Sequence, residues 1–250
     1  MFRMAVISLL PELVEPVCRT GVVGRACERG LLSVNLVSPR DFTSDRHRTT
    51  DDRPYGGGPG MVLKYEPVRD AIRAARRELP KGCAEFVLSA RGKRFDQAIA
   101  RKLAVDSGLL LVAGRYEGID ERIVKGEVSG ELSLGDFVLS GGELAAAVVI
   151  DAVARLLPGV LGHEESALHD SHMEGLLGHP QYTRPEAVDG MRVPDSLLGG
   201  HHEAIRRWRL KQALGVTWLR RPELLERREM NPEEHDLLQE FMREYKAEGH

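Results

Sequence analysis

Short apolar runs of strand length alternate with helix-length amphipathic segments in the first part of the sequence, up to Leu157. Four runs have the composition or alternation of strands: Phe2–Leu10, Leu32–Val37, Ala84–Ser89 and Gly108–Gly114. Helices are expected between and after them, over Pro11–Arg29, Val68–Leu79, Asp96–Leu103 and Glu143–Leu157. Because parallel strands need a crossover connection, usually a helix, this order predicts an α/β domain with a mostly parallel sheet.

The sequence after Val160 predicts a smaller, helical domain. Periodicity is absent over Val160–Pro185 and returns in three helix-like segments: His202–Leu214, Pro222–Arg228 and Pro232–Lys246. Asn231 is the expected start of the last segment, because asparagine caps helices and proline suits the first helical position. We therefore expect an α/β domain over residues 1–160, a linker over 161–176 and a helical domain over 177–250.

The composition disfavours several classes of protein. The longest apolar runs, such as Leu144–Ile150, have seven residues, whereas a membrane-spanning helix needs about 20. Met1–Leu10 lacks the flanks of a signal peptide. The three cysteines, at positions 18, 27 and 83, show no CxxC spacing. We therefore expect no membrane span, no disulfide framework and a reducing, cytoplasmic location.

Positive charge is concentrated near the C-terminus although the net charge is -3. The stretch Arg206–Arg228 contains eight Lys or Arg residues and two Glu, and it also holds both tryptophans, Trp208 and Trp218. A basic face with interleaved aromatic rings suits a phosphate backbone and unstacked bases. A solvated amphipathic helix whose tryptophans lie in the core explains the same pattern equally well.

Several familiar catalytic and binding motifs are missing. The sequence has no GxGxxG, HExxH or GxSxG motif, and DDRPYGGGPGMVLK lacks the GK[ST] of a P-loop. A histidine-rich stretch that includes His169, Asp170 and His172 does not have the spacing of a complete zinc site, so we expect no metal there.

Two glycine-rich loops remain as places for a ligand. They are AGRYEGIDER, Ala113–Arg122, and SLGDFVLSGGEL, Ser133–Leu144, and each follows an apolar run. Ligands of open α/β sheets bind at the carboxyl ends of strands, where these loops should lie, and glycine lets a backbone approach a ligand closely. The two loops could enclose a nucleoside through main-chain hydrogen bonds. Plain turns and a salt-bridged surface are the alternative.

Six motifs together resemble one known family. In chain order they are RPYGGGPGM, GRYEGIDER, SLGDFVLSGGEL, DAVARLLPGVL, YTRPE and GHHEAIRRWRLKQ. They are similar to those of the bacterial tRNA (guanine-N1)-methyltransferases called TrmD, and the resemblance extends from the first strand to about Leu225. It implies a SPOUT-class fold, in which S-adenosylmethionine binds in a deep trefoil knot of the α/β domain.

The resemblance also implies an activity and partners. Family members methylate N1 of the guanosine immediately 3′ of the anticodon, at position 37 of tRNA, so the anticodon stem-loop is the expected partner. They act as homodimers with the active site between subunits, and methyl transfer is Mg2+-dependent. Residues 1–160 would then bind the cofactor, 161–176 would carry the general base and 177–250 would bind tRNA.

The resemblance assigns site residues by motif. Asp170 matches the proposed general base and Arg155 the arginine near the guanine. The expected cofactor-binding residues are Leu88, Ser89, Gly114, Tyr116, Glu117, Gly118, Ser133, Leu134, Gly135, Asp136, Phe137, Val138, Leu139, Gly141 and Gly142. The expected tRNA-binding residues are Gly60, Arg115, Glu117, His201, His202, Arg206, Arg207, Arg209 and Lys211. No residue is assigned to a metal.

The chemistry of N1 methylation agrees with the first two assignments. The reaction removes the N1 proton, so it needs a base within hydrogen-bond reach, and an arginine can stabilise negative charge on O6. Structural alternatives exist for both residues. Arg155 could pair with Asp151 on one helix face, and Asp170 could start a helix with Ser171 and Glu174 in a capping box.

The sequence departs from the family pattern at a few positions. Ser89-Ala90-Arg91-Gly92 stands where SPQG is usual, which makes Leu88–Gly92 the least secure part of the cofactor assignment. His172 replaces a common apolar aromatic residue, and Ala113 a common cysteine. Two other functions compete with methylation: a non-catalytic RNA-binding protein that retains the SPOUT fold, and an α/β enzyme acting on a free nucleotide.

Overall fold

The computed structural model describes residues 1–162, 170–247 and 249. The chain divides into two compact units, Met1–Glu164 and Glu165–His250. This boundary falls inside the segment 161–176 that we expect to be the linker.

A five-stranded parallel sheet forms the centre of the first unit. The strands are β1 (Phe2–Ile7), β2 (Leu32–Val37), β5 (Ala84–Arg94), β6 (Gly108–Ala113) and β7 (Gly130–Ser133), and their order in the sheet is β2-β1-β6-β5-β7. All four neighbouring pairs are parallel. The predicted α/β class with a mostly parallel sheet is therefore confirmed, while the trefoil knot stays a prediction.

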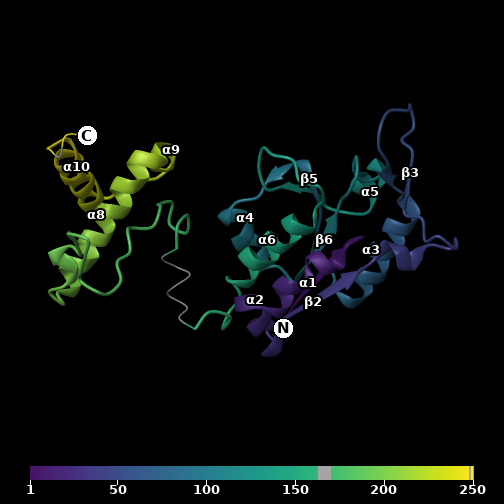
Figure 1. The fold of residues 1–250 in the computed structure, drawn as a ribbon, viewed down its shortest axis with the longest axis horizontal. Helices are drawn as coiled ribbons and strands as arrows, with labels where there is room; N and C mark the ends of the chain where they lie inside the picture. Colours follow the sequence, from purple (N-terminus) through teal and green to yellow (C-terminus); the bar gives the residue numbers. More distant parts are fainter. Residues whose placement is uncertain (163–169, 248, 250) are drawn as a thin grey trace. The chain divides into compact units, whose positions relative to one another are not determined.

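Helices cover both faces of this sheet (Figure 1). One face packs against α1 (Glu15–Arg19), α2 (Gly21–Glu28), α4 (Gln97–Ala104) and α6 (Glu143–Ala154), and the other against α3 (Tyr65–Glu78) and α5 (Glu121–Gly126). Successive residues of β1 alternate between the two cores: Met4 and Val6 join the first, Ala5 and Ile7 the second. The strand is therefore buried on both faces, which explains its continuous apolar sequence.

Some elements differ from the prediction in extent. The segment Pro11–Arg29 is divided into η1 (Pro11–Leu13), α1 and α2, because Thr20 is extended and Gly21 has a φ of +62°. The segment between β2 and α3, for which no strand was predicted, contains the short helix η2 (Pro39–Phe42) and the strand β3 (Asp51–Asp52), which pairs with β4 (Val62–Leu63). Strand β5 continues past Ser89 through a bulge between Leu88 and Lys93.

The second unit is built on helices α8 (His202–Arg220), α9 (Pro222–Glu226) and α10 (Pro232–Ala247). Its core is formed by Leu176, Leu214, Leu237 and Leu238. The predicted cap of α10 is confirmed and is reciprocal. The Glu234 amide donates to Asn231 Oδ1 at 3.0 Å, and the Asn231 amide donates to Glu234 Oε2 at 2.9 Å.

Shorter elements connect residue 170 to α8. They are β8 (Ala187–Val188), β9 (Met191–Arg192) and the 3-10 turn η3 (Asp195–Leu197). Helix α8 continues six residues beyond the predicted end at Leu214. Across the described residues, no helix has both the length and the apolar character required to cross a membrane.

Candidate active site

One bulge and two loops lie at the carboxyl-terminal parts of three adjacent strands. The bulged segment Ser89–Gly92 comes from β5, Gly114–Gly118 follows β6, and Gly135–Gly142 follows β7. Because β6, β5 and β7 are neighbours in a parallel sheet, all three segments emerge at the same edge. The glycine-rich segments of the sequence therefore lie around one opening.

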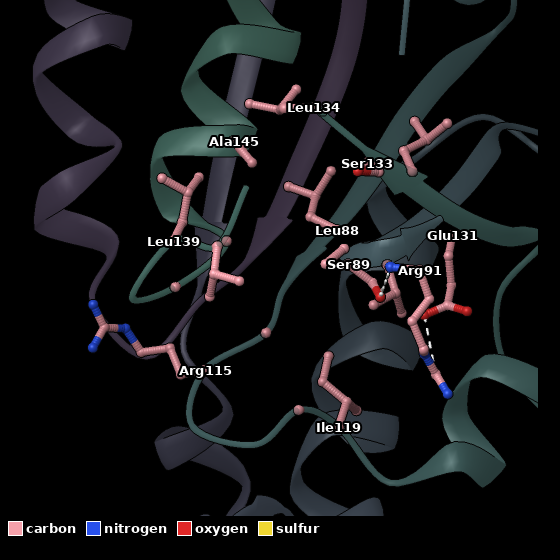
Figure 2. Close-up of a pocket in the computed structure, with 18 of the residues that line it drawn as sticks. Leu88, Ser89, Arg91, Arg115, Ile119, Glu131, Ser133, Leu134, Leu139 and Ala145 are labelled. Atoms are coloured by element: carbon pink, nitrogen blue, oxygen red, sulfur yellow. Dashed lines mark hydrogen bonds and ion pairs between the residues drawn. The ribbon is translucent and has the colours of Figure 1, made fainter. Parts of the chain in front are cut away.

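These segments enclose a pocket of about 490 Å³ (Figure 2). Its lining includes every residue that we expect to bind the cofactor except Asp136, which is exposed. Residues from distant parts of the sequence, such as Leu88, Tyr116 and Leu139, therefore lie around one cavity. The least secure segment, Leu88–Gly92, contributes Leu88, Ser89, Ala90 and Arg91 to it.

Main-chain hydrogen bonds join two of the loops. The Gly142 amide donates to the Gly114 carbonyl at 2.8 Å, and Arg115 and Gly141 form an isolated β-bridge. A Cβ at position 142 would lie 2.8 Å from the Ala113 Cα, closer than side chains approach a backbone. Gly142 is thus required by close contact between two backbone segments, and a plain turn does not explain it.

Tyr116 and Glu117 join the pocket to the loop that contains Gly60. Tyr116 has a φ of +60°, a strained value for a bulky residue, and is half exposed. The Glu117 amide donates to the Met61 carbonyl at 3.0 Å, and a Cβ on Gly60 would overlap the Glu117 side chain. The structure therefore brings Gly60, expected at the tRNA, against a residue of the pocket.

A buried carboxylate holds Arg115. Arg115 Nε donates to Glu143 Oε1 at 3.0 Å, and the Ser8 hydroxyl donates to the same oxygen at 3.1 Å. Glu143 is 1% exposed, and its Oε2 is buried with no hydrogen-bond partner among the described residues. Glu143 was not among the predicted site residues, although its position directly after Gly141 and Gly142, in the first turn of a helix, was the available signal.

A second ion-pair group lies at the rim of the pocket. Arg91 Nη2 lies 3.0 Å from Glu121 Oε2 and 3.2 Å from Glu131 Oε1, and its amide donates to Ser89 Oγ at 3.1 Å. Figure 2 shows Arg91 between Ser89 and Glu131. The hydrogen bond with Glu121 and the charge of Glu131 raise the pKa of the Arg91 guanidinium. Neither carboxylate was predicted.

Of the two expected catalytic residues, only Arg155 belongs to the unit that contains the pocket, and it lies outside the pocket lining. Arg155 is the C-terminal cap of α6, whereas the pocket is bordered by Gly142 and Ala145 at the other end of that helix. Twelve helical residues separate these ends by about 18 Å. Asp170 belongs to the second unit, and no helix begins there, so the capping box considered for it does not form.

Several of the basic residues expected at tRNA are paired within the second unit. Arg206 bonds to Glu203 and Glu233, and Arg207 lies 3.2 Å from Glu233. Lys211 is bonded to Glu240 at 2.7 Å and Glu244 at 2.8 Å. Burial lowers the pKa of Lys211, but the hydrogen bonds with Glu240 and Glu244 and the negative charges of these residues together outweigh it and leave the pKa raised.

The other expected tRNA contacts on α8 are more open. His201 caps the helix and His202 begins it, and both are exposed. Arg209 is exposed and has no ion-pair partner within the described ranges. Of the histidines in the linker region, His163 and His169 lie outside the described residues. Among the residues that are described, no group of three or more His, Cys, Asp or Glu is arranged to hold a metal.

Comparison with known proteins identifies the family. A family model described as tRNA (Guanine-1)-methyltransferase TrmD matches residues 2–227. The chain belongs to the TrmD family. Curated family members named tRNA (guanine-N(1)-)-methyltransferase are 59% identical in Methylococcus capsulatus and in Nitrosococcus oceani, over 98% of each chain. A family member of the same name from Escherichia coli is 56% identical over 99% of this chain and 97% of its own.

Proposed function

We propose that the protein transfers a methyl group from S-adenosylmethionine to N1 of the guanosine immediately 3′ of the tRNA anticodon, at position 37. Family membership over residues 2–227 is the observation that carries this proposal. The names of its relatives support the tRNA substrate and the guanine N1 position. The identity of the methyl donor and the position of the guanosine in tRNA go beyond these names and are part of our proposal.

The pocket at the carboxyl edge of the sheet suits the proposed donor. Its volume of about 490 Å³ is in the range of small-molecule sites. Leu88, Leu134 and Leu139 offer an apolar surface for an adenine ring, and the loop backbones offer amides and carbonyls for its polar edge. When bound, S-adenosylmethionine supplies an activated methyl group, so the protein needs no nucleophile of its own.

Two side chains carry the proposed acid-base chemistry. Asp170 accepts the N1 proton as the new nitrogen–carbon bond forms, and Arg155 stabilises the negative charge that develops on O6. The tRNA backbone is bound by the second unit, through exposed basic residues of the stretch Arg206–Arg228. The expected Mg2+ dependence stays a prediction to which no residue is assigned.

A homodimer accounts for the position of Arg155. Within one chain Arg155 and the pocket lie at opposite ends of α6, so we propose that a second copy completes the site. An exposed apolar group on the first unit supports such an interface: Phe137, Val138 and Leu139 beside the pocket, and Leu144 and Val148 on α6, are 38–89% exposed.

The role of Asp170 is tested by Asp170→Asn. This variant replaces the carboxylate with a neutral carboxamide of the same shape, so we expect normal binding of S-adenosylmethionine and tRNA but single-turnover transfer slowed by about 100-fold or more. Asp236→Asn, an exposed acid on α10, is the matched control and should react at the parental rate. A parental rate for Asp170→Asn would place the base elsewhere.

Mixed dimers test whether the site spans two subunits. Gly142→Val damages the pocket and Asp170→Asn the base, so each homodimer should be inactive. If Asp170 serves the partner's pocket, a mixed dimer contains one intact site and regains up to half of the parental activity per dimer. If Asp170 serves its own pocket, the mixture stays inactive.

A further inference from the structure

The two tryptophans of the chain occupy different environments. Trp218 packs on the core of the second unit and meets Tyr245 edge-on, with ring centroids 6.0 Å apart. Trp208 is not part of that core. Its ring contacts His179 and Tyr182, each with a centroid distance of 6.1 Å, and Tyr182 is 50% exposed. Trp208 therefore belongs to a surface aromatic cluster with Tyr182 and His179.

The aromatic cluster has a defined orientation. His179 Nδ1 lies 3.0 Å from the Pro180 carbonyl oxygen, and since a carbonyl only accepts, Nδ1 carries the proton. This bond holds the imidazole ring where it packs edge to face with Trp208, at an interplanar angle of 70°. Packing of this kind supports the indole ring without parallel stacking of the two rings.

Helix α8 separates its basic residues into two sets. With about 100° per residue, Arg207, Lys211 and Arg206 lie about 20°, 60° and 80° around the helix from buried Leu214. These are the residues whose charges are neutralised by Glu203 and by acids of α10. Arg209 and Trp208 lie about 140° and 120° from Leu214 in opposite directions, so both are on the exposed half of the helix, about 100° apart.

We propose that Trp208, Tyr182 and Arg209 form a binding platform for an unpaired nucleotide of the RNA substrate, a role that rests on the proposed function. Aromatic faces stack on any base that is not paired, and an unneutralised arginine beside them binds the adjoining phosphate. A double-stranded segment offers no free base face, so the platform is specific for single-stranded RNA. Arg206, Arg207 and Lys211 instead stabilise the contact between α8 and α10.

The chain's two tryptophans provide a direct probe. Full-length protein labelled with 5-fluorotryptophan should give two 19F resonances. The resonance that is missing in Trp208→Phe belongs to Trp208. We expect an anticodon stem-loop RNA, added without cofactor, to shift the Trp208 resonance and leave the Trp218 resonance in place. Trp208→Ala and Tyr182→Ala should each weaken RNA binding by about 5- to 150-fold, the range for loss of one base stack.

Salt dependence tests the role of Arg209. Arg209→Ala should reduce the slope of log affinity against log salt by about 1, while Arg243→Ala, on the exposed surface of α10, should leave the slope unchanged. If RNA binds and is methylated at the parental rate but neither tryptophan resonance moves, the platform is wrong and the methyltransferase proposal stands. If Trp208 shifts but no methyl group is transferred, the platform stands and the proposed activity is wrong.

Discussion

Arg115 Nε donates a hydrogen bond of 3.0 Å to Oε1 of Glu143, a carboxylate that is 1% exposed and 28 residues further along the chain. The pair lies directly under Gly141, where a Cβ would come 2.8 Å from Arg115 Nε. The glycine loop, the arginine and the buried acid therefore form one packed unit at the edge of the pocket.

Glu143→Gln should destabilise this unit, because the amide removes the charge that balances the Arg115 guanidinium in a buried position. We expect the free energy of unfolding to fall by about 1–3 kcal/mol, measured by urea denaturation. Glu66→Gln, an exposed acid in the first turn of α3, is the control and should change it by less than about 0.5 kcal/mol. Equal effects in the two variants would show that the buried pair does not stabilise the fold.

Gly142→Ala should weaken S-adenosylmethionine binding. Its new methyl group meets the backbone of Ala113 and Gly114, so the two loops have to move apart. Overpacking of this kind costs about 1–3 kcal/mol, which corresponds to a Kd about 5- to 150-fold higher by calorimetry. Gly126→Ala adds the same methyl group where nothing lies within 4 Å and should bind like the parent. Parental affinity in Gly142→Ala would argue against these loops as the cofactor site.

Arg91→Ala should loosen the rim of the pocket. Its side chain is 65% exposed, and exposed ion pairs contribute about 0.2–1 kcal/mol, so we expect the Kd of S-adenosylmethionine to rise by only about 2- to 5-fold. Lys102→Ala, on the exposed face of α4, is the control. An unchanged Kd in both variants would show that Arg91 has no part in shaping the pocket.

Acid should weaken the contact between α8 and α10. The hydrogen bond from Lys211 holds the pKa of Glu240 below its ordinary value of 4.5. A carboxyl with a lowered folded pKa contributes stability above its unfolded pKa and loses it as the pH falls through the folded pKa. Urea unfolding followed by tryptophan fluorescence, which reports the second unit, should therefore show lower stability below about pH 4.5. Lys211→Met should lose less over the same range, and an identical pH profile would contradict the assignment.

The parallel sheet and the loops that line the pocket could be predicted because their signals are local. The residues of an apolar run such as Gly108–Gly114 themselves favour a strand, and those of a loop such as Ser133–Leu144 themselves favour turns. The order of these elements along the chain then determines which loops lie next to one another. Pocket residues that are held by contacts between distant parts of the sequence were harder to predict. The sequence around Glu131 does not indicate an ion pair with Arg91, because that ion pair depends on the bulge in β5.

The second unit shows the limit of charge patterns. The run of basic residues in α8 indicated a nucleic-acid surface, but the sequence could not show which side of the helix faces the acids of α10. Pairing of Lys211 with Glu240 joins residues 29 apart in sequence, and such contacts depend on how the two helices pack. The sequence also could not show that the two tryptophans differ in environment, with Trp218 on the core and Trp208 in the surface aromatic cluster.

The central claim is methylation of N1 of guanosine 37, and the most direct measurement follows the transferred group. Tritium-labelled S-adenosylmethionine is incubated with tRNA transcripts that carry guanosine or adenosine at position 37, and the labelled nucleoside is identified after digestion. We expect N1-methylguanosine from the guanosine transcript and no label in the adenosine transcript. Equal labelling of both transcripts, or label on any other atom or nucleotide, would contradict the proposed function.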